Sequence, residues 1–185
     1  MEWILASASP RRRELLKEYI PDFCVIPAKG EEKAAMGLTP QQLVCALARQ
    51  KAEEVAALTE AQGKAVIGSD TVVAYAGEVL GKPKDEADAK RMLTMLSGKV
   101  HQVYTGVCVV LPSGERIVEA DCTDVEFVRL YDEQIDSYIA TGSPLDKAGA
   151  YGIQDGGLVK GIVGSYSNVV GFPCELFEKI LRTIK

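Results

Sequence analysis

A charged residue interrupts an apolar run near the middle of the chain. Asp70 lies within residues 65–75, AVIGSDTVVAY, a composition consistent with a strand that is covered on both faces. Alternation along such a strand places Asp70 on the same face as Val66 and Val72. A carboxylate buried there costs free energy unless it meets a metal ion, a base or hydrogen-bond donors. The pattern favours a functional carboxylate, but a strand-end aspartate bonded to a backbone amide, or a bulge at Gly68, would also explain it.

A lysine interrupts the apolar face of a predicted helix in a similar way. Lys51 follows Leu47 by four residues and precedes Val55 by four, which puts it near the middle of the apolar arc. Its stem could pack on that arc while its ammonium group reaches water. Alternatively, the ammonium group is held in a cleft, where it meets an anionic ligand. Taken alone, the spacing slightly favours the first interpretation.

A group of arginines follows the first predicted strand, where residues 7–13 read SASPRRR. Guanidinium groups and free backbone amides at the start of a helix favour an anion such as phosphate. Adjacent helical positions diverge by about 100°, so at most two of Arg11, Arg12 and Arg13 can face one ligand. A solvated basic patch is the alternative. The position directly after a strand, common among phosphate-binding loops, raises the odds of the phosphate interpretation.

A glycine-containing segment around Lys82 superficially resembles a Walker A loop. Residues 77–83 read GEVLGKP, in which the two glycines are too close together and proline stands where Ser or Thr should bind magnesium. We therefore reject a P-loop. Lys82 can still lie in a cleft, although a surface lysine in a turn explains the pattern equally well.

Other catalytic classes fit the sequence less well. It contains no G-x-S-x-G motif, and its one histidine, His101, lies in a strand pattern without a nucleophile partner, which favours a structural role. The remaining charged candidates form a set suited to phosphoryl chemistry, in which cations meet phosphates and carboxylates meet a hard metal ion. The members of this set are Arg11, Arg12, Lys51, Lys82, Glu32 and Asp70.

Strands and helices alternate around these candidates. Strands are predicted over residues 1–6, 23–26, 65–75, 78–80, 101–111 and 116–130. Helices are predicted from Pro10 with Ser9 as N-cap, from Pro40 to near Gly63, and over residues 85–96, 132–141 and 172–184. Residues 142–171 are rich in glycine and receive no assignment. Because the elements alternate first and the strands then pair locally, the predicted class is α/β with a mixed sheet.

Composition limits the remaining possibilities. A length of 185 residues predicts one domain, and a net charge of -5 argues against a broad nucleic-acid surface while permitting a local basic pocket. There is no basic leader, and no apolar run approaches the ~18 residues of a membrane span, so neither a signal peptide nor a membrane partner is expected. Five scattered cysteines without a C-x-x-C pair argue against a zinc site and a disulfide framework, and cytoplasm is the default location.

These segments resemble the Maf family of nucleoside triphosphate pyrophosphatases, once described as septum-formation inhibitors. The resemblance runs through nearly the whole chain, in family order, and is therefore specific. The segments that carry it are LASASPRR at 5–12, Glu31-Glu32, ARQKA at 48–52, GSDTVV at 68–73, GKP at 81–83, Ser97-Gly98 with His101 and Thr105-Gly106, and DKAGAYGIQ at 146–154.

The resemblance implies a single Maf-like domain over residues 1–185. Its fold would be an elongated two-lobed mixed-sheet α/β fold resembling inosine triphosphate pyrophosphatases, with the cleft between the lobes. It implies hydrolysis between the α and β phosphates, a Mg²⁺ or Mn²⁺ requirement and a homodimer. The subgroup looks like the dTTP/UTP pyrophosphatases, because the Asp70-Thr71 pair and the YGIQ stretch at 151–154 are both intact.

The family pattern also implies roles for individual residues. Asp70 would be the general base for the attacking water and would share the metal ion with Glu32, which the pattern favours over Glu31. The residues expected to hold the triphosphate are Ser7, Arg11, Lys51 and Lys82, with Lys147 as a weaker candidate for the same task. The residues associated with the choice of a pyrimidine base are Arg12, Thr71 and Gln154.

Two other functions remain compatible with the same residues. One is a regulatory protein that binds nucleotides and acts on septum formation through a partner, since it would use the same pocket. The other is an enzyme of broad range that also cleaves modified pyrimidine triphosphates, such as those of pseudouridine or methylated uridine. Specificity constants across a nucleotide panel would separate this second possibility from strict dTTP/UTP use.

Overall fold

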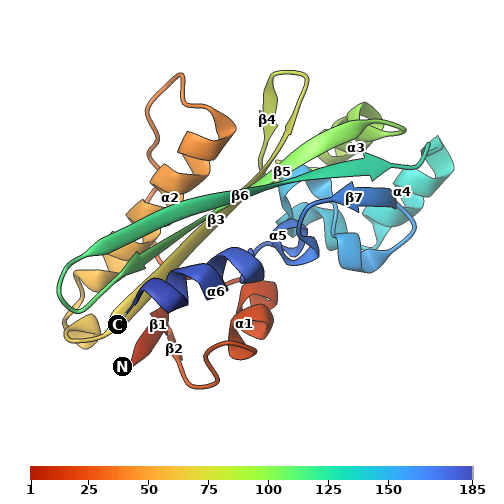
Figure 1. The fold of residues 1–185 in the computed structure, drawn as a ribbon. Coiled ribbons are helices and arrows are strands. Elements are labelled where there is room, and N and C mark those ends of the chain that lie inside the picture. Colours follow the sequence, from red (N-terminus) through yellow and green to blue (C-terminus); the bar gives the residue numbers. More distant parts are fainter. Residues whose placement is uncertain (185) are drawn as a thin grey trace. The chain divides into compact units, whose positions relative to one another are not determined.

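The computed structural model describes residues 1–184, and these form a sheet with helices packed against it (Figure 1). The strands are β1 (Trp3–Leu5), β2 (Cys24–Val25), β3 (Ala65–Tyr75), β4 (Glu78–Leu80), β5 (Val100–Val110), β6 (Arg116–Phe127) and β7 (Val159–Val163). The α-helices are α1 (Pro10–Lys17), α2 (Pro40–Ala56), α3 (Glu86–Leu96), α4 (Asp132–Ala140), α5 (Tyr166–Val170) and α6 (Cys174–Thr183). Short 3₁₀ helices are η1 (Thr59–Ala61), η2 (Ser143–Asp146), η3 (Ala148–Ala150) and η4 (Ile153–Asp155).

The sheet is mixed, as the sequence predicts. Its strands follow the order β2-β1-β3-β5-β6-β7, and β4 pairs with β3 outside this path. β1 runs parallel to both β2 and β3, with Ile4 opposite Val66. The β3–β4 and β6–β7 pairs are antiparallel. The predicted α/β class with a mixed sheet is therefore confirmed.

The chain divides into two compact units. The first comprises residues 1–70, residues 105–121 and the segment from Gly171 onward, and the second comprises residues 71–104 and 122–170. The boundaries fall inside β3, β5 and β6, so each of these strands contributes residues to both units. The single domain and the cleft between two lobes stay predictions.

In the first unit, two apolar clusters form the core. One joins the small residues of α2, among them Ala48 and Ala52, to Ile4 and Val66. The other joins Leu5 and Ile67 to side chains of α1 and α6 that include Leu16, Phe177 and Ile180. Neighbouring residues of β1 and β3 enter different clusters because strand side chains alternate between faces. Helix α2 therefore covers one face, and α1 and α6 cover the other.

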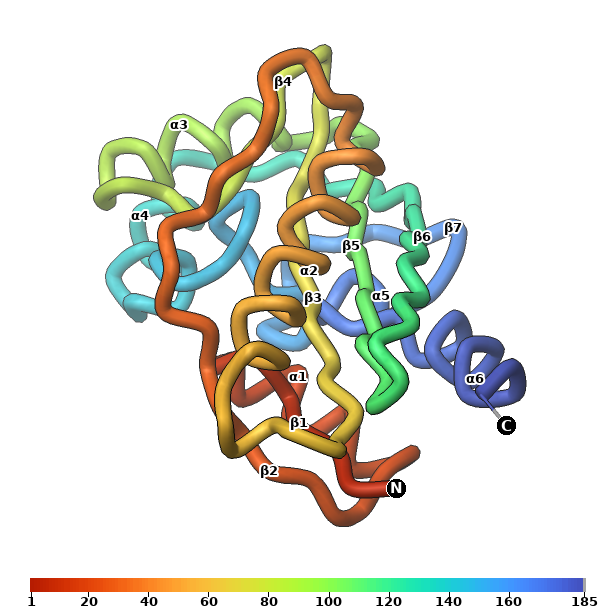
Figure 2. The backbone as a smooth tube through the Cα atoms, turned by 90° about the vertical axis from the view of Figure 1, so that its left-hand side faces the viewer, coloured from red at the N-terminus to blue at the C-terminus, as the bar shows by residue number. Residues whose placement is uncertain are grey.

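The contact between α2 and β3 is unusually close, and Figure 2 shows the helix lying along the strand. A Cβ at Gly68 would collide with the carbonyl oxygen of Ala48 and would lie 2.7 Å from the amide nitrogen of Ala52. Glycine at this position therefore lets the helix backbone approach the strand. This close approach accounts for glycine at position 68.

In the second unit, one apolar cluster forms the core. It includes Leu93 and Leu96 of α3, Ile135 of α4, and Phe127 of β6. The His101 ring lies inside this core, with its centroid 4.9 Å from that of Phe127 in an edge-to-face arrangement. The core is therefore mainly apolar, but it includes a titratable ring.

Two predictions about the elements need correction or completion. The helix expected to run from Pro40 to near Gly63 ends at Ala56, because Leu58 has an extended backbone and the short helix η1 follows it. Residues 142–171, left unassigned from the sequence, contain η2, η3, η4, β7 and α5. These elements are too short for a hydrophobic period to develop. Within residues 1–184, no helix is both long and apolar enough to span a bilayer.

Candidate active site

The carboxylate and the lysine singled out from the sequence contact each other. Asp70 of β3 is 7% exposed, and its Oδ1 accepts a hydrogen bond of 2.6 Å from Lys51 Nζ of α2. The close approach of α2 at Gly68, two residues before Asp70 on the same face, brings the lysine within reach. The ammonium group therefore does not simply reach water, which was one of the two interpretations of its spacing.

A second carboxylate shares the same ammonium group. Glu32 Oε1, in the loop between β2 and α2, lies 2.8 Å from Lys51 Nζ. The Lys51 side chain is 19% exposed, whereas that of Glu32 is 57% exposed, so Glu32 approaches from the solvent side. Two acidic oxygens thus converge on one cationic group.

Burial dominates the protonation behaviour of Asp70. Loss of solvent raises the pKa of Asp70 above its ordinary value, and the charge of Glu32 acts in the same direction. The positive charges of Lys51 and Arg12 lower the pKa of Asp70 but do not cancel the effect of burial. A carboxylate with a raised pKa is a suitable proton acceptor at neutral pH.

The predicted phosphate-binding segment brings Ser7 and Arg12 together. Ser9 caps α1, and its side chain accepts a hydrogen bond from the backbone N–H of Arg12. Arg12 Nε donates to the carbonyl oxygen of Gly171 at 2.8 Å, and Nη1 donates to Ser7 Oγ at 3.4 Å. Arg11 is half-buried on the same first turn. Because the charge of Arg12 acts on the pKa of Asp70, this segment belongs to the same electrostatic surroundings as the carboxylates.

The second unit contains the other predicted residues. Thr71 follows Asp70 on β3 and is half-buried, and Lys82 is exposed in the loop between β4 and α3. Lys147 and Gln154 approach each other across Gly152, where an added Cβ would lie 2.9 Å from Lys147 Cε and 2.9 Å from Gln154 Nε2. Two side chains predicted to bind substrate therefore lie against one glycine.

A hydrogen-bond network holds the segment that carries Lys147 and Gln154. Asp155 Oδ2 accepts from Tyr138 Oη and from Ser143 Oγ, both at 2.6 Å. Tyr138 Oη also accepts from the backbone N–H of Gly152 at 3.0 Å, and Lys147 Nζ donates to Ser143 Oγ at 2.9 Å. The sequence did not reveal this network, because its members lie largely in the segment without periodicity.

His101 anchors the same segment from the core of its unit. Its side chain is fully buried, and Nε2 lies 2.7 Å from Tyr151 Oη, three residues before Gln154. Burial lowers the pKa of His101 to about 4, so the ring is neutral at physiological pH. These contacts agree with the structural role favoured from the sequence.

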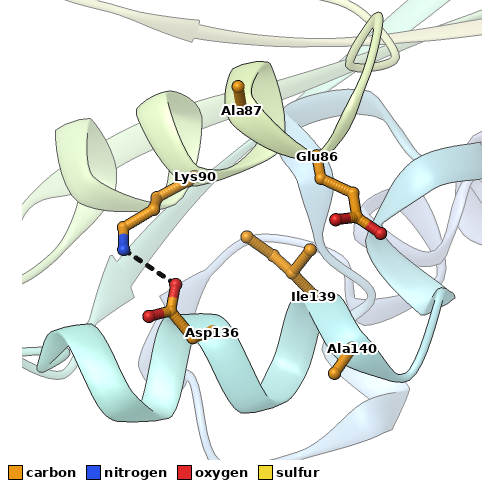
Figure 3. Close-up of a pocket in the computed structure, with 6 residues that line it drawn as sticks. All are labelled: Glu86, Ala87, Lys90, Asp136, Ile139 and Ala140. Carbon is orange, nitrogen blue, oxygen red and sulfur yellow. Dashed lines mark hydrogen bonds and ion pairs between the residues drawn. The ribbon is translucent and has the colours of Figure 1, made fainter.

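A hollow on the second unit is separate from the predicted residues. It has a volume of about 430 Å³ and lies between α3 and α4 (Figure 3). The residues that line it are Glu86, Ala87, Lys90, Asp136, Ile139 and Ala140. Lys90 and Asp136 already form an ion pair of 2.8 Å there, and none of the candidate residues contributes to the lining.

Comparison with solved structures concerns the fold. The structure of the Staphylococcus aureus Ham1 protein matches with a TM-score of 0.56 and 18% identity, and the match covers 100% of both chains. The structure of a HAM1 protein from Coxiella burnetii matches with a TM-score of 0.52 and 15% identity over 99% of each chain. The chain therefore has the α/β fold of these proteins.

The family is identified by sequence. Residues 2–184 match the Maf-like protein family, and the chain belongs to it. A relative from Agathobacter rectalis named dTTP/UTP pyrophosphatase is 50% identical, over 98% of this chain and 96% of its own. Relatives of the same name from Thermococcus gammatolerans and Moorella thermoacetica are 51% and 52% identical, over 96% of this chain and 94% and 92% of theirs. The resemblance noted from the motifs is confirmed.

Proposed function

We propose that this protein hydrolyses dTTP and UTP to the nucleoside monophosphate and pyrophosphate with the help of a divalent metal ion. The observation that carries the proposal is the contact of buried Asp70 with Lys51, which also contacts Glu32. Relatives that share about half of the sequence bear the name dTTP/UTP pyrophosphatase, which supports the same substrates here. Carboxylates and cations together are what hydrolysis of a triphosphate needs.

Asp70 acts as the general base in this proposal. A water oxygen bonds to the α-phosphorus, the bond from that phosphorus to the α–β bridging oxygen breaks, and Asp70 takes the proton of the water. The raised pKa of Asp70 supports this role, because a base works best when its pKa is near the working pH. Ser7, Arg11, Lys51 and Lys82 hold the triphosphate and offset the charge that grows on pyrophosphate, with Lys147 as a weaker contributor.

Glu32 and Asp70 are the proposed ligands of Mg²⁺ or Mn²⁺. Their oxygens converge on the Lys51 ammonium group, so the arrangement already suits a positive charge. Residues 1–184 contain no group of three or more His, Cys, Asp or Glu side chains suited to a metal, and Mg²⁺ is often held by one or two carboxylates plus substrate phosphates. A bound cation would neutralise phosphate charge and make the attacking water more acidic.

Arg12, Thr71 and Gln154 are the proposed determinants of the pyrimidine base, by analogy with the subgroup that the motifs resemble. A cytoplasmic location and a homodimer complete the proposal. The first rests on the scattered cysteines and the second on the family resemblance.

A nucleotide panel tests the proposal. Pyrophosphate release is measured with Mg²⁺ and with Mn²⁺ for dTTP, UTP, dCTP, the purine triphosphates and the triphosphates of pseudouridine and 5-methyluridine. We expect kcat/KM for dTTP and UTP to exceed that for the purine triphosphates by about 100-fold, because a site that hydrogen-bonds one base leaves polar groups unpaired with another. Release of inorganic phosphate without pyrophosphate, or equal rates with purines, would refute it.

A further inference from the structure

The loop that carries Glu32 is tied to α2 by two side chains to which the sequence analysis gave no role. Gln50 and Glu54 lie one turn apart on α2 and point toward residues 29–33, as their hydrogen bonds show. Residues four apart on a helix share one face, so both can reach the same stretch of loop. Lys51, the ion-pair partner of Glu32, directly follows Gln50.

Gln50 holds the backbone on both sides of Glu32. Its Nε2 donates to the carbonyl oxygen of Glu31 at 2.6 Å, and its Oε1 accepts from the backbone N–H of Lys33 at 3.0 Å. One amide group thus satisfies an acceptor and a donor of the loop in the way a neighbouring strand would. The intervening residue, Glu32, has its main chain fixed while its side chain extends to Lys51.

Glu54 holds the start of the same loop. Its Oε1 accepts from the backbone N–H of Lys29 at 2.7 Å and from that of Gly30 at 3.0 Å, and Oε2 lies 3.1 Å from the Gly30 nitrogen. A Cβ at Gly30 would lie 2.7 Å from Glu54 Oε2, so glycine leaves space for the carboxylate. Hydrogen bonds from backbone N–H groups to an ionised carboxylate are among the stronger ones in proteins.

These contacts matter because the Glu32 side chain is itself largely exposed. More than half of it (57%) is exposed to solvent, so packing holds it less than it would hold a buried side chain, and its ion pair with Lys51 is the contact that directs it. A ligand carboxylate on a freely moving loop loses conformational freedom when it binds a cation, which weakens binding. Fixing the backbone beforehand removes part of that loss.

We propose that Gln50 and Glu54 are positioning residues that hold residues 29–33 against α2 so that Glu32 meets the divalent cation beside Asp70. This inference rests on the proposed function only in its assignment of Glu32 and Asp70 as metal ligands. Residues that orient metal ligands typically change metal affinity by about 10–100-fold when they are replaced.

The test uses the full chain and Mn²⁺ as the probe. Free Mn²⁺ is followed by electron paramagnetic resonance during titration, with and without a dUTP analogue that has a methylene bridge between the α and β phosphates. We expect Gln50→Ala to weaken Mn²⁺ binding about tenfold and to speed hydrogen exchange at the Lys33 amide. Gln41→Ala is the matched control, because Gln41 is an exposed glutamine of the same helix, and should change neither.

A second pair of variants covers the case in which Gln50→Ala does not fold. Glu54→Gln and Glu54→Ala both remove the charge, but only glutamine retains an oxygen that can accept from Lys29 and Gly30. We expect Glu54→Ala to bind Mn²⁺ less tightly than Glu54→Gln by several-fold, with faster exchange at the Gly30 amide. The difference between the two variants isolates the hydrogen bonds from the charge.

The outcomes separate this inference from the proposed function. Unchanged Mn²⁺ affinity in Gln50→Ala, or equal affinity in the two Glu54 variants, overturns the inference even if the wild type hydrolyses dTTP. If the variants bind Mn²⁺ more weakly but the wild type releases no pyrophosphate, the positioning role stands and the proposed activity is refuted. A wild type that binds no Mn²⁺ in either condition overturns the positioning role, and pyrophosphate release then decides the activity on its own.

Discussion

The two units hold their predicted functional residues by different physical means. In the first unit, Lys51 meets two carboxylates directly, and a helix packed backbone-to-backbone on a strand sets the distance. In the second unit, Lys147 and Gln154 lie on a segment of short turns that is held by Tyr138, Ser143 and Asp155. A charge placed by regular elements leaves a pattern in the sequence, whereas a charge placed by a network of side chains does not.

The largest effect on activity is expected from a substitution of the buried carboxylate. Asp70→Asn keeps the shape of the side chain but removes its ability to take a proton, so kcat for dTTP should fall about 100-fold or more. Asp22→Asn, an exposed aspartate in the same unit, is the control and should retain the wild-type rate. Near-normal turnover by Asp70→Asn would remove Asp70 from the mechanism and with it the contrast between the units.

The close contact between α2 and β3 should also be sensitive to a single methyl group. Gly68→Ala would collide with backbone atoms of Ala48 and Ala52, which cannot rotate away, so we expect a loss of about 2 kcal/mol in the free energy of unfolding. Urea denaturation measures this loss. Gly81→Ala meets no atom within 4 Å and should leave the free energy of unfolding nearly unchanged. Equal stability of the two variants would mean that the helix can move aside cheaply.

The sequence predicted the site residues of the first unit better than those of the second, because regular elements position most of them. The run around Asp70 and the position of Lys51 in an apolar arc are periodic signals, and the two residues form an ion pair in which Asp70 is buried and Lys51 half-buried. The contact itself was not predictable, because periodicity describes one element at a time and the distance depends on a glycine in the neighbouring strand. Gln50 and Glu54 are four residues apart, which places them on one face of the helix. Their hydrogen-bond partners are backbone atoms of an irregular loop, which the sequence pattern does not locate.

Residues 142–171 escaped prediction for a different reason. Their 3₁₀ turns are three or four residues long, and the backbone of Gly149 has a φ of +70° that interrupts any regular pattern. The network through Tyr138 and Asp155 then joins residues 17 apart, a separation that carries no periodic signal. Motif resemblance alone drew attention to Lys147 and Gln154.

Each unit also contains a buried titratable group, and the two groups make the free energy of unfolding change with pH in opposite directions. His101 has a pKa of about 4 in the fold against 6.5 ordinarily, so the unfolded chain takes up the proton first. Its contribution to stability is complete above pH 6.5 and is lost as the pH falls toward 4, by up to about 1.4 kcal/mol per pH unit. Asp70 acts oppositely. Because its pKa in the fold lies above the ordinary value of 3.8, the folded state keeps the proton after the unfolded chain has lost it, so the contribution of Asp70 to stability is lost as the pH rises above 3.8.

His101→Gln separates these two effects. The free energy of unfolding is measured between pH 7 and pH 5, and the difference between wild type and variant cancels the contribution of Asp70. We expect the wild type to lose stability relative to the variant as the pH falls, since only the wild type has the histidine to protonate. A difference that stays constant with pH would mean that the ring takes up its proton in the fold at the same pH as in the unfolded chain, and is therefore not shielded from solvent.

The smallest effect on activity is expected from a substitution at Gly152, because an added methyl group there would meet only the flexible ends of side chains. Its φ of -118° suits alanine, so the backbone tolerates Gly152→Ala, but the new Cβ would displace the ends of Lys147 and Gln154. We expect KM for dTTP to rise about fivefold with kcat little changed, because the contacts that are lost hold the substrate and the transition state equally well. Gly161→Ala, in open space on β7, is the matched control. A fall in the free energy of unfolding as large as that of Gly68→Ala would show that both units are held by rigid packing, whereas a lower kcat with unchanged KM would assign Lys147 and Gln154 to the transition state.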